Sequence, residues 1–171
     1  MVERTDQTNC KLLRSTSALL VLTMLLAVTA LAGSPKQIIG ATEIIEVEPA
    51  KLRIKARVDT GAQTTSIHAE NIVIDLHGDP RGKAIAFDLV NQQGEVQRIN
   101  THVAKRILVK TSEGSENRYA VPLTLTLTWQ QTSKTVLVTL NNRAHLRYRL
   151  LLGRNWLRGD YLVDVELNDE D

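Results

Sequence analysis

Strict alternation of hydrophobic and polar residues is the feature that most constrains the fold of this chain. Residues 121–129 read Val-Pro-Leu-Thr-Leu-Thr-Leu-Thr-Trp. An extended chain places every leucine of this run on one face and every threonine on the other, which indicates a half-buried β-strand. Pro122 has no N–H to donate to a neighbouring strand, so its end of the strand is expected at a sheet edge.

The same two-residue period recurs along most of the chain. Strands are expected at 42–48, 51–58, 71–76, 84–90, 95–103, 106–111, 118–129, 134–140, 150–152 and 161–165. Turn-forming residues predict two hairpins, one with its loop at Asn91–Gly94 and one with its loop around Gly114. A glycine ends the strand 150–152, and one or two helical turns are expected after it. Many short strands separated by regular turn signals predict an all-β barrel or sandwich.

The first 32 residues are expected to be a signal peptide. Three basic residues precede an apolar run of 15 residues from Ala18 to Ala32, which ends in an Ala-x-Ala-like cleavage site. The run is shorter than the roughly 18 residues that a spanning helix needs. Cleavage near Ala32 predicts a periplasmic or secreted protein with no membrane span left. An uncleaved membrane anchor is the alternative.

Removing 32 of the 171 residues leaves 139, enough for one domain with its own hydrophobic core. We expect a linker at 33–42, a barrel domain at 43–166 and an acidic tail at 167–171. The net charge of this part is about +1, and its basic residues are scattered among acids with few aromatics, so no nucleic-acid partner is expected. Cys10 precedes the apolar run, so the domain has neither disulfides nor a thiol nucleophile.

An acidic residue directly follows one of the alternating strands. Residues 59–62 read Asp-Thr-Gly-Ala and lead into a cluster of serine and threonine. The strand 51–58 would deliver the carboxylate at its end, in a loop rich in hydrogen-bond donors. The same tripeptide can also be an ordinary turn in which the aspartate caps the backbone. Far downstream, Leu151-Leu152-Gly153 precedes the expected short helix.

The two motifs together resemble those of retropepsin-like aspartic peptidases, in which an Asp-Thr-Gly loop and a hydrophobic-hydrophobic-Gly segment lie together under the active site. The span 43–164 is also similar to a small bacterial group labelled ATP-dependent zinc protease, whose motifs match residues 55–69, 147–157 and 161–164. Relatives tend to have Thr-Asp-Arg where this chain has Asn-Asn-Arg at 141–143. The resemblance implies a small closed barrel, all-β, with one short C-terminal helix.

The label of that group names ATP and zinc, but the residues suggest neither. The sequence has no phosphate-cradling G-x-x-x-x-G-K-[ST] loop and no H-E-x-x-H zinc motif. Its four histidines are far apart in the sequence and could meet only through folding: His68, His77, His102 and His145. We therefore expect no cofactor and no metal, and a zinc-dependent peptidase stays open as an alternative.

The resemblance also implies roles for individual residues. Asp59 would be the catalytic residue. The residues expected to support its loop are Thr60, Gly61, Ala62, Leu151, Leu152 and Gly153. The chemistry needs two facing carboxylates that share one proton, and the chain has only one Asp-Thr-Gly. A homodimer that places Asp59 opposite Asp59′ on its two-fold axis is therefore expected.

The expected partner is a peptide or protein substrate that lies extended in the cleft beneath a hairpin tip. Asn91–Gly94 is the first candidate for this flap and Gly114 is the second; the alternative is that both are plain surface hairpins. Some relatives are encoded near glutamate ligases, which suggests glutamate-rich peptides. Arg154 is expected near the dimer seam or as an ordinary surface residue. The alternative function is a non-catalytic peptide- or partner-binding module, in which Asp59 only stabilises a turn.

Overall fold

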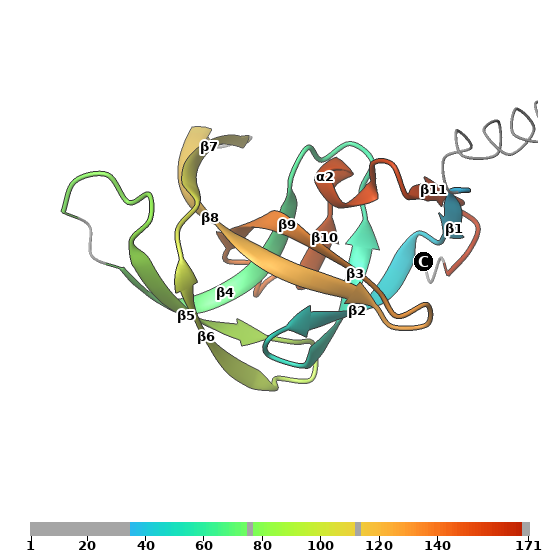
Figure 1. Ribbon diagram of the computed structural model, residues 1–171, viewed down its shortest axis with the longest axis horizontal. Helices are drawn as coiled ribbons and strands as arrows, with labels where there is room; N and C mark the ends of the chain where they lie inside the picture. The colour runs from blue at the N-terminus through green and yellow to red at the C-terminus, as the bar shows by residue number, and fades with distance from the viewer. Residues whose placement is uncertain (1–34, 75–76, 112–113, 169–171) are drawn as a thin grey trace, which may run out of the picture. The chain divides into compact units, whose positions relative to one another are not determined.

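The computed structural model describes residues 35–74, 77–111 and 114–168 (Figure 1). The expected signal peptide and the last residues of the expected acidic tail lie outside the described residues. Among those described, no helix is long and apolar enough to cross a membrane. The elements are β1 (Gln37–Ile39), β2 (Thr42–Glu48), β3 (Leu52–Val58), β4 (Thr65–Ile74), β5 (Ala84–Val90), β6 (Val96–His102), β7 (Lys105–Thr111), β8 (Gly114–Leu127), β9 (Thr132–Asn141), β10 (Leu150–Leu152), α2 (Arg154–Leu157) and β11 (Tyr161–Val163).

Six strands form a closed ring. Their order is β10-β3-β2-β8-β9-β4, and β4 pairs back to β10. The short strand β10 closes the ring because it runs parallel to β3 on one side and antiparallel to β4 on the other. β5 and β6 extend the sheet from β4, and β7 pairs with the first half of β8 (Figure 1). The prediction of a small, closed, all-β barrel with one short helix near the C-terminus is confirmed.

The predicted alternation places one face of each ring strand in the core. The inward residues of β3 and β8 are Leu52, Ile54, Ala56, Val58, Val121, Leu123, Leu125 and Leu127, all buried. On the other face of β8, hydroxyl pairs connect the threonines to β9. Thr124 pairs with Thr135 at 2.7 Å and Thr126 pairs with Ser133 at 2.8 Å between hydroxyl oxygens. Cross-strand pairs of this kind stabilise a sheet by roughly 0.2–1 kcal/mol each.

Pro122 lies where β8 changes partners on one of its sides. β7 pairs with β8 as far as Ala120, and β2 pairs with β8 from Thr124 onward. On the opposite side, Pro122 faces Leu137 of β9. On this side Pro122 has no paired residue, because β7 ends before it and β2 begins after it. The predicted unpaired position therefore exists, but in the middle of a long strand and not at its end.

Two strands differ from the sequence prediction. β1 lies within 33–42, the segment expected to be a linker, where it pairs in parallel with β11 and buries Ile39. β4 begins at Thr65, well before the expected start at 71. Residues 65–69 are buried on both faces, and in the ring this part of β4 also has a strand on each edge, β10 and β9. A strand buried on both faces shows no alternation to read.

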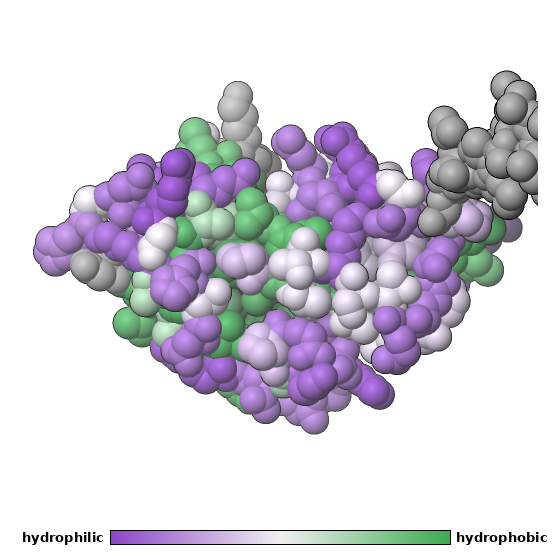
Figure 2. All heavy atoms as spheres, in the orientation of Figure 1, coloured by the Kyte–Doolittle hydropathy of each residue, from purple (hydrophilic) through white to green (hydrophobic). Residues whose placement is uncertain are grey.

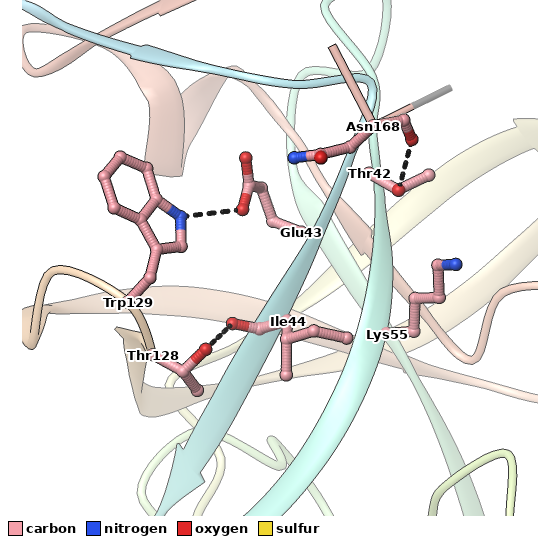
Figure 3. Close-up of a pocket in the computed structure, with 7 residues that line it drawn as sticks. All are labelled: Thr42, Glu43, Ile44, Lys55, Thr128, Trp129 and Asn168. Atoms are coloured by element: carbon pink, nitrogen blue, oxygen red, sulfur yellow. Dashed lines mark hydrogen bonds between the residues drawn. The ribbon is translucent and has the colours of Figure 1, made fainter. Parts of the chain in front are cut away.

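The buried carboxylate of Glu43 joins two turns at one end of the barrel. Its Oε1 accepts the backbone N–H of Gly40 at 2.8 Å. Its Oε2 accepts the indole N–H of Trp129 at 2.9 Å, the bond drawn in Figure 3. Both oxygens therefore have the donors that a buried carboxylate needs. Figure 3 shows Glu43 and Trp129 among the residues that line a pocket of about 290 Å³. None of the residues that line this pocket belongs to the Asp59 loop.

Candidate active site

Asp59 begins the loop that follows β3. Its backbone N–H donates to the carbonyl of Leu152 at 3.0 Å, one step beyond the parallel pairing of Val58 with Leu152. The side chain of Asp59 is half-buried, and the next two residues, Thr60 and Gly61, are exposed. The strand therefore delivers the carboxylate to the barrel surface, at the base of a loop whose tip faces solvent.

Two backbone groups of the loop hold the Asp59 carboxylate. Oδ1 accepts the N–H of Gly61 at 2.8 Å and the N–H of Ala62 at 3.0 Å. A Cβ on residue 61 would lie 3.1 Å from Oδ1, tighter than an ordinary contact. Glycine at 61 thus lets its own N–H approach the carboxylate without crowding. No hydrogen bond to Oδ2 occurs within the described part of the chain, so this oxygen is available to a water or a facing group.

Leu151, Leu152 and Gly153 lie against the loop, where the resemblance had put them. β10 runs between β3 and β4, and Leu152 is fully buried. The N–H of Gly153 donates to the hydroxyl of Thr65 at 3.1 Å. A Cβ on Gly153 would lie 2.6 Å from the carbonyl carbon of Thr64, so no other residue fits without moving the backbone. Gly153 brings the start of α2 into direct contact with the end of the loop.

Arg154 ties the loop to α2. Its Nη1 donates to the carbonyl of Thr60 at 3.1 Å and to the carbonyl of Gly61 at 2.9 Å. Its backbone N–H also donates to the carbonyl of Ala62 at 2.9 Å. The side chain that was expected at a dimer seam or on the surface thus holds the two loop residues that follow Asp59.

Asn155 is a second supporting residue, and the sequence reasoning did not single it out. Its Oδ1 accepts both the N–H of Thr65 at 2.8 Å and the Thr65 hydroxyl at 2.9 Å. Its Nδ2 donates to the carbonyl of Leu137 at 2.7 Å. Asn155 therefore links α2 to both β4 and β9. The sequence signal for this role was weak: Asn155 is a polar residue two positions after Gly153, at the start of the expected helix.

A cavity of about 360 Å³ lies beside the loop. Residues 62–64 line it from the loop, residues 107–109 from β7, and Leu151 from β10. Arg118 of β8 and Arg143 of the segment between β9 and β10 also line it. The β7–β8 hairpin, which contains the second flap candidate Gly114, is thus the hairpin that borders the candidate site.

The first flap candidate, the turn Asn91–Gly94, is a different kind of structure. The side chain of Gln92 exchanges hydrogen bonds with the backbone of Lys55, and Asn91 donates to the carbonyl of Arg53 at 3.2 Å. These bonds fix the turn against β3, and the turn does not line the cavity beside Asp59. The asparagine and glutamine of this turn hold the hairpin against a neighbouring strand, so the structure gives a flap at this turn no support, and the expectation stays a prediction.

The histidines do not gather into a metal site in the described part of the chain, where no group of three or more His, Cys, Asp or Glu could hold an ion. His68 is fully buried on β4. Its Nδ1 accepts the backbone N–H of Arg143 at 3.0 Å, and its Nε2 lies 2.9 Å from the carboxylate of Glu70. With Nδ1 as acceptor, Nε2 carries the proton and donates to Glu70. His68 therefore positions the segment that carries Arg143.

A closed β-barrel that sets an Asp-Thr-Gly loop against a Leu-Leu-Gly strand defines the retropepsin-like class, as the resemblance implied. A family model described as RimB-like, the retropepsin-like aspartic endopeptidase RimB, matches residues 38–169. The chain belongs to this family.

Curated relatives carry a different name, "Probable alpha-L-glutamate ligase". The protein from Shewanella pealeana is 38% identical over 116 residues, 65% of this chain and 24% of its own length. The protein from Parasynechococcus marenigrum is 39% identical over 117 residues, 66% of this chain and 24% of its own. The chain thus spans about a quarter of the curated relatives that it matches.

Among solved structures, the chain is similar to a Legionella pneumophila protein described as having unknown function (DUF785). The TM-score is 0.64 and the sequence identity is 25%, over 78% of this chain and 96% of that protein.

Proposed function

We propose that the protein is an aspartic endopeptidase whose catalytic dyad forms from Asp59 of two copies at the axis of a homodimer. The observation that carries this proposal is the Asp59 carboxylate itself. It is held by two backbone N–H groups on one oxygen, and it lies in a loop whose tip is exposed. Membership of a retropepsin-like endopeptidase family supports the same reading.

The chemistry follows from placing two such carboxylates across one water. Like charges about 3 Å apart do not both ionise, so the pair shares one proton. The ionised carboxylate takes a proton from the water, which attacks the peptide carbonyl, and the protonated one polarises that carbonyl. The role of this chain is to fix the first carboxylate through Gly61 and Ala62, with Arg154 holding the loop from behind.

The surface of the barrel supports pairing with a second copy. Large hydrophobic side chains are exposed at β1, at β11 and in the turn after β11: they are Ile38, Leu162, Val165 and Leu167. Leu108 of β7 is exposed at a separate place, toward the other end of the barrel (Figure 1 and Figure 2). Exposed apolar residues close together, such as those at β1 and β11, often mark contact surfaces. In a two-fold dimer each would meet the same surface of the other copy.

We further propose that the substrates are peptides or proteins with glutamate-rich segments. The curated relatives are named as glutamate ligases, and a domain like this one makes up about a quarter of each. A hydrolase domain that shares a chain with a glutamate ligase meets the glutamate-containing product of that ligase, which supports glutamate-rich segments as substrates here. The expected periplasmic or secreted location stays a prediction from residues 1–32.

A peptidase assay on glutamate-rich peptides at acidic and neutral pH tests the proposal. Asp59→Asn keeps the shape of the side chain and removes the acid, so it should abolish cleavage and leave the thermal unfolding temperature nearly the same. Sedimentation should show a dimer in the active sample. Cleavage that survives Asp59→Asn, or that is lost only on adding a chelator, would show that the mechanism is a different one.

A further inference from the structure

Two arginines from different segments meet at the cavity beside Asp59. Arg118 comes from β8, within the hairpin that borders the site, and Arg143 comes from the segment between β9 and β10. The other walls of the cavity are mixed: Ile107, Leu108 and Leu151 contribute aliphatic surface, and the remaining lining includes polar side chains from the loop and from β4 and β9. A cavity with aliphatic surface and guanidinium groups suits a side chain that has methylene groups and a terminal anion.

Arg143 is a largely buried cation. Its exposed fraction is 9%, and its Nε donates to the carbonyl of Tyr148 at 3.1 Å. Its backbone N–H is fixed by the ring of His68. No carboxylate of the described residues lies within ion-pair distance of it. Burying a charge without an ion-pair partner has an unfavourable desolvation free energy. A ligand that brings the opposite charge to the guanidinium would offset it.

Two neighbouring charges, those of Arg118 and Asp59, affect the pKa of Arg143. Burial lowers the pKa of the Arg143 guanidinium, the positive charge of Arg118 lowers that pKa further, and the Asp59 carboxylate raises it. The three groups therefore lie close enough to interact. Asp59 forms no ion pair with Arg143 in the described structure, so its charge acts on the guanidinium only from beyond ion-pair distance.

Arg118 already holds a carboxylate. Its Nε and Nη2 donate to Oε2 of Glu116 at 3.1 and 2.9 Å. The Arg118 side chain is 14% exposed and the Glu116 side chain is 51% exposed. The Arg118 guanidinium therefore binds a carboxylate at the cavity wall. In the single chain that carboxylate is the exposed Glu116 of the same strand.

We propose that Arg143, assisted by Arg118, binds the side-chain carboxylate of the substrate residue that enters this cavity, and so selects glutamate over glutamine there. Both arginines would act as specificity-determining residues and not as catalytic residues. Arginine suits this role because its planar fork can hold both carboxylate oxygens. The inference rests on the proposed peptidase function and assigns its substrate preference to two named side chains.

The test is a position scan with the full-length protein. A fluorogenic hexaglutamate peptide is compared with six peptides in which one glutamate at a time is replaced by glutamine. The parent should lose roughly 10- to 100-fold in kcat/KM at one position, as expected when a hydrogen-bonded charge is removed. In Arg143→Gln, kcat/KM should no longer differ between glutamate and glutamine at that position, mainly because KM for the glutamate peptide rises. Arg143→Lys and Arg118→Gln should give intermediate losses, and the exposed Arg81→Gln should scan like the parent.

Each outcome decides something. An unchanged scan in both Arg143→Gln and Arg118→Gln overturns the inference, as does a parent that shows no preference at any position. If the parent cleaves no peptide, the proposed function fails first. Binding of the same peptides to the parent and to Arg143→Gln then tests the arginines alone. If Arg143→Gln does not fold, judged by circular dichroism, Arg143→Lys and Arg118→Gln carry the comparison.

Discussion

The guanidinium of Arg154 and the carbonyl of Gly61 are joined by a hydrogen bond of 2.9 Å, although the two residues are far apart in the sequence. The bond connects the first residue of α2 to the centre of the Asp-Thr-Gly loop. The position of the Asp59 carboxylate therefore depends on the segment after β10 as well as on β3.

Replacing Arg154 with Met should loosen this loop. The change removes two hydrogen bonds to loop carbonyls, each with a net contribution of about 1 kcal/mol. We expect a fall in kcat of the proposed peptidase that exceeds the change in KM, together with modest destabilisation in urea unfolding. Arg158→Met, at an exposed residue just after the same helix, is the matched control. Equal effects of the two changes would argue against a special role for Arg154.

Two glycines of the site should respond differently to alanine. Gly153→Ala places a Cβ 2.6 Å from the backbone of Thr64, so it should cost about 1–3 kcal/mol of stability through overpacking. Gly61→Ala places a Cβ 3.1 Å from the Asp59 carboxylate, so it should reduce activity more than stability. Chemical unfolding and peptide cleavage, measured on both variants, separate these effects. The reverse ranking would contradict this view of the loop.

The exposed leucine of β11 offers a test of the proposed dimer. Leu162 is exposed in the single chain, so Leu162→Glu should not disturb the core. If β1 and β11 contact a second copy, the change should weaken self-association in sedimentation and make activity depend more steeply on protein concentration. Val96→Glu, at an equally exposed position on β6, serves as the control. Unaltered self-association in Leu162→Glu would place the dimer contact elsewhere.

The hydrogen bond between the buried Glu43 carboxylate and the indole of the exposed Trp129 should show energetic coupling. Glu43→Gln presents an amide N–H₂ where a carboxylate oxygen now accepts a donor, which should cost roughly 1–3 kcal/mol of stability. Trp129→Phe removes one of the two donors. A double-mutant cycle on urea unfolding should give a coupling energy well above zero. Strict additivity would mean that the bond in Figure 3 contributes little.

Tyr161 predicts a change of stability at alkaline pH. Burial raises the pKa of its hydroxyl, and the negative charges of Asp160 and Glu43 raise it further. A pKa that is higher in the folded state gives a stabilisation that is complete below about pH 10 and is lost as the pH rises through the folded-state value.

Tyr161→Phe isolates this effect. The hydroxyl is buried without a hydrogen-bond partner, and the ring stacks on Trp156 at 4.4 Å between centroids. Phenylalanine keeps the stacking and removes the unsatisfied group, so stability at neutral pH should stay equal or rise by up to about 1 kcal/mol. The loss of stability above about pH 10 should become smaller. Tyr119→Phe is the control, and thermal unfolding across this pH range is the measurement.

Much of the barrel was readable from the sequence because its strands have one face in the core and one in solvent. The Leu-Thr alternation of β8 and the polar-apolar alternation of β3 are examples. β4 was misjudged at its start because residues 65–69 are buried on both faces. β1 was missed because a three-residue strand carries almost no local signal and depends on a partner at the other end of the chain.

The candidate site was readable only in part. Asp59 and the Leu-Leu-Gly segment were recognised because short motifs record backbone geometry that only glycine permits. Arg154 and Asn155 were not assigned to the loop because their bonds join residues about 90 positions apart. Arg143 stood in a segment that was noticed only for its neighbour, Asn142. Its burial beside Asp59 depends on how the β9–β10 segment folds back, which no local pattern encodes.

The parallel pairing of Gln37–Ile39 with Tyr161–Val163 has a consequence for biosynthesis. Gln37–Ile39 lies outside the barrel ring, and its partner strand is synthesised only after every strand of that ring. This small two-stranded sheet therefore forms later than the ring strands are made, and pairing over such a long separation predicts slow folding.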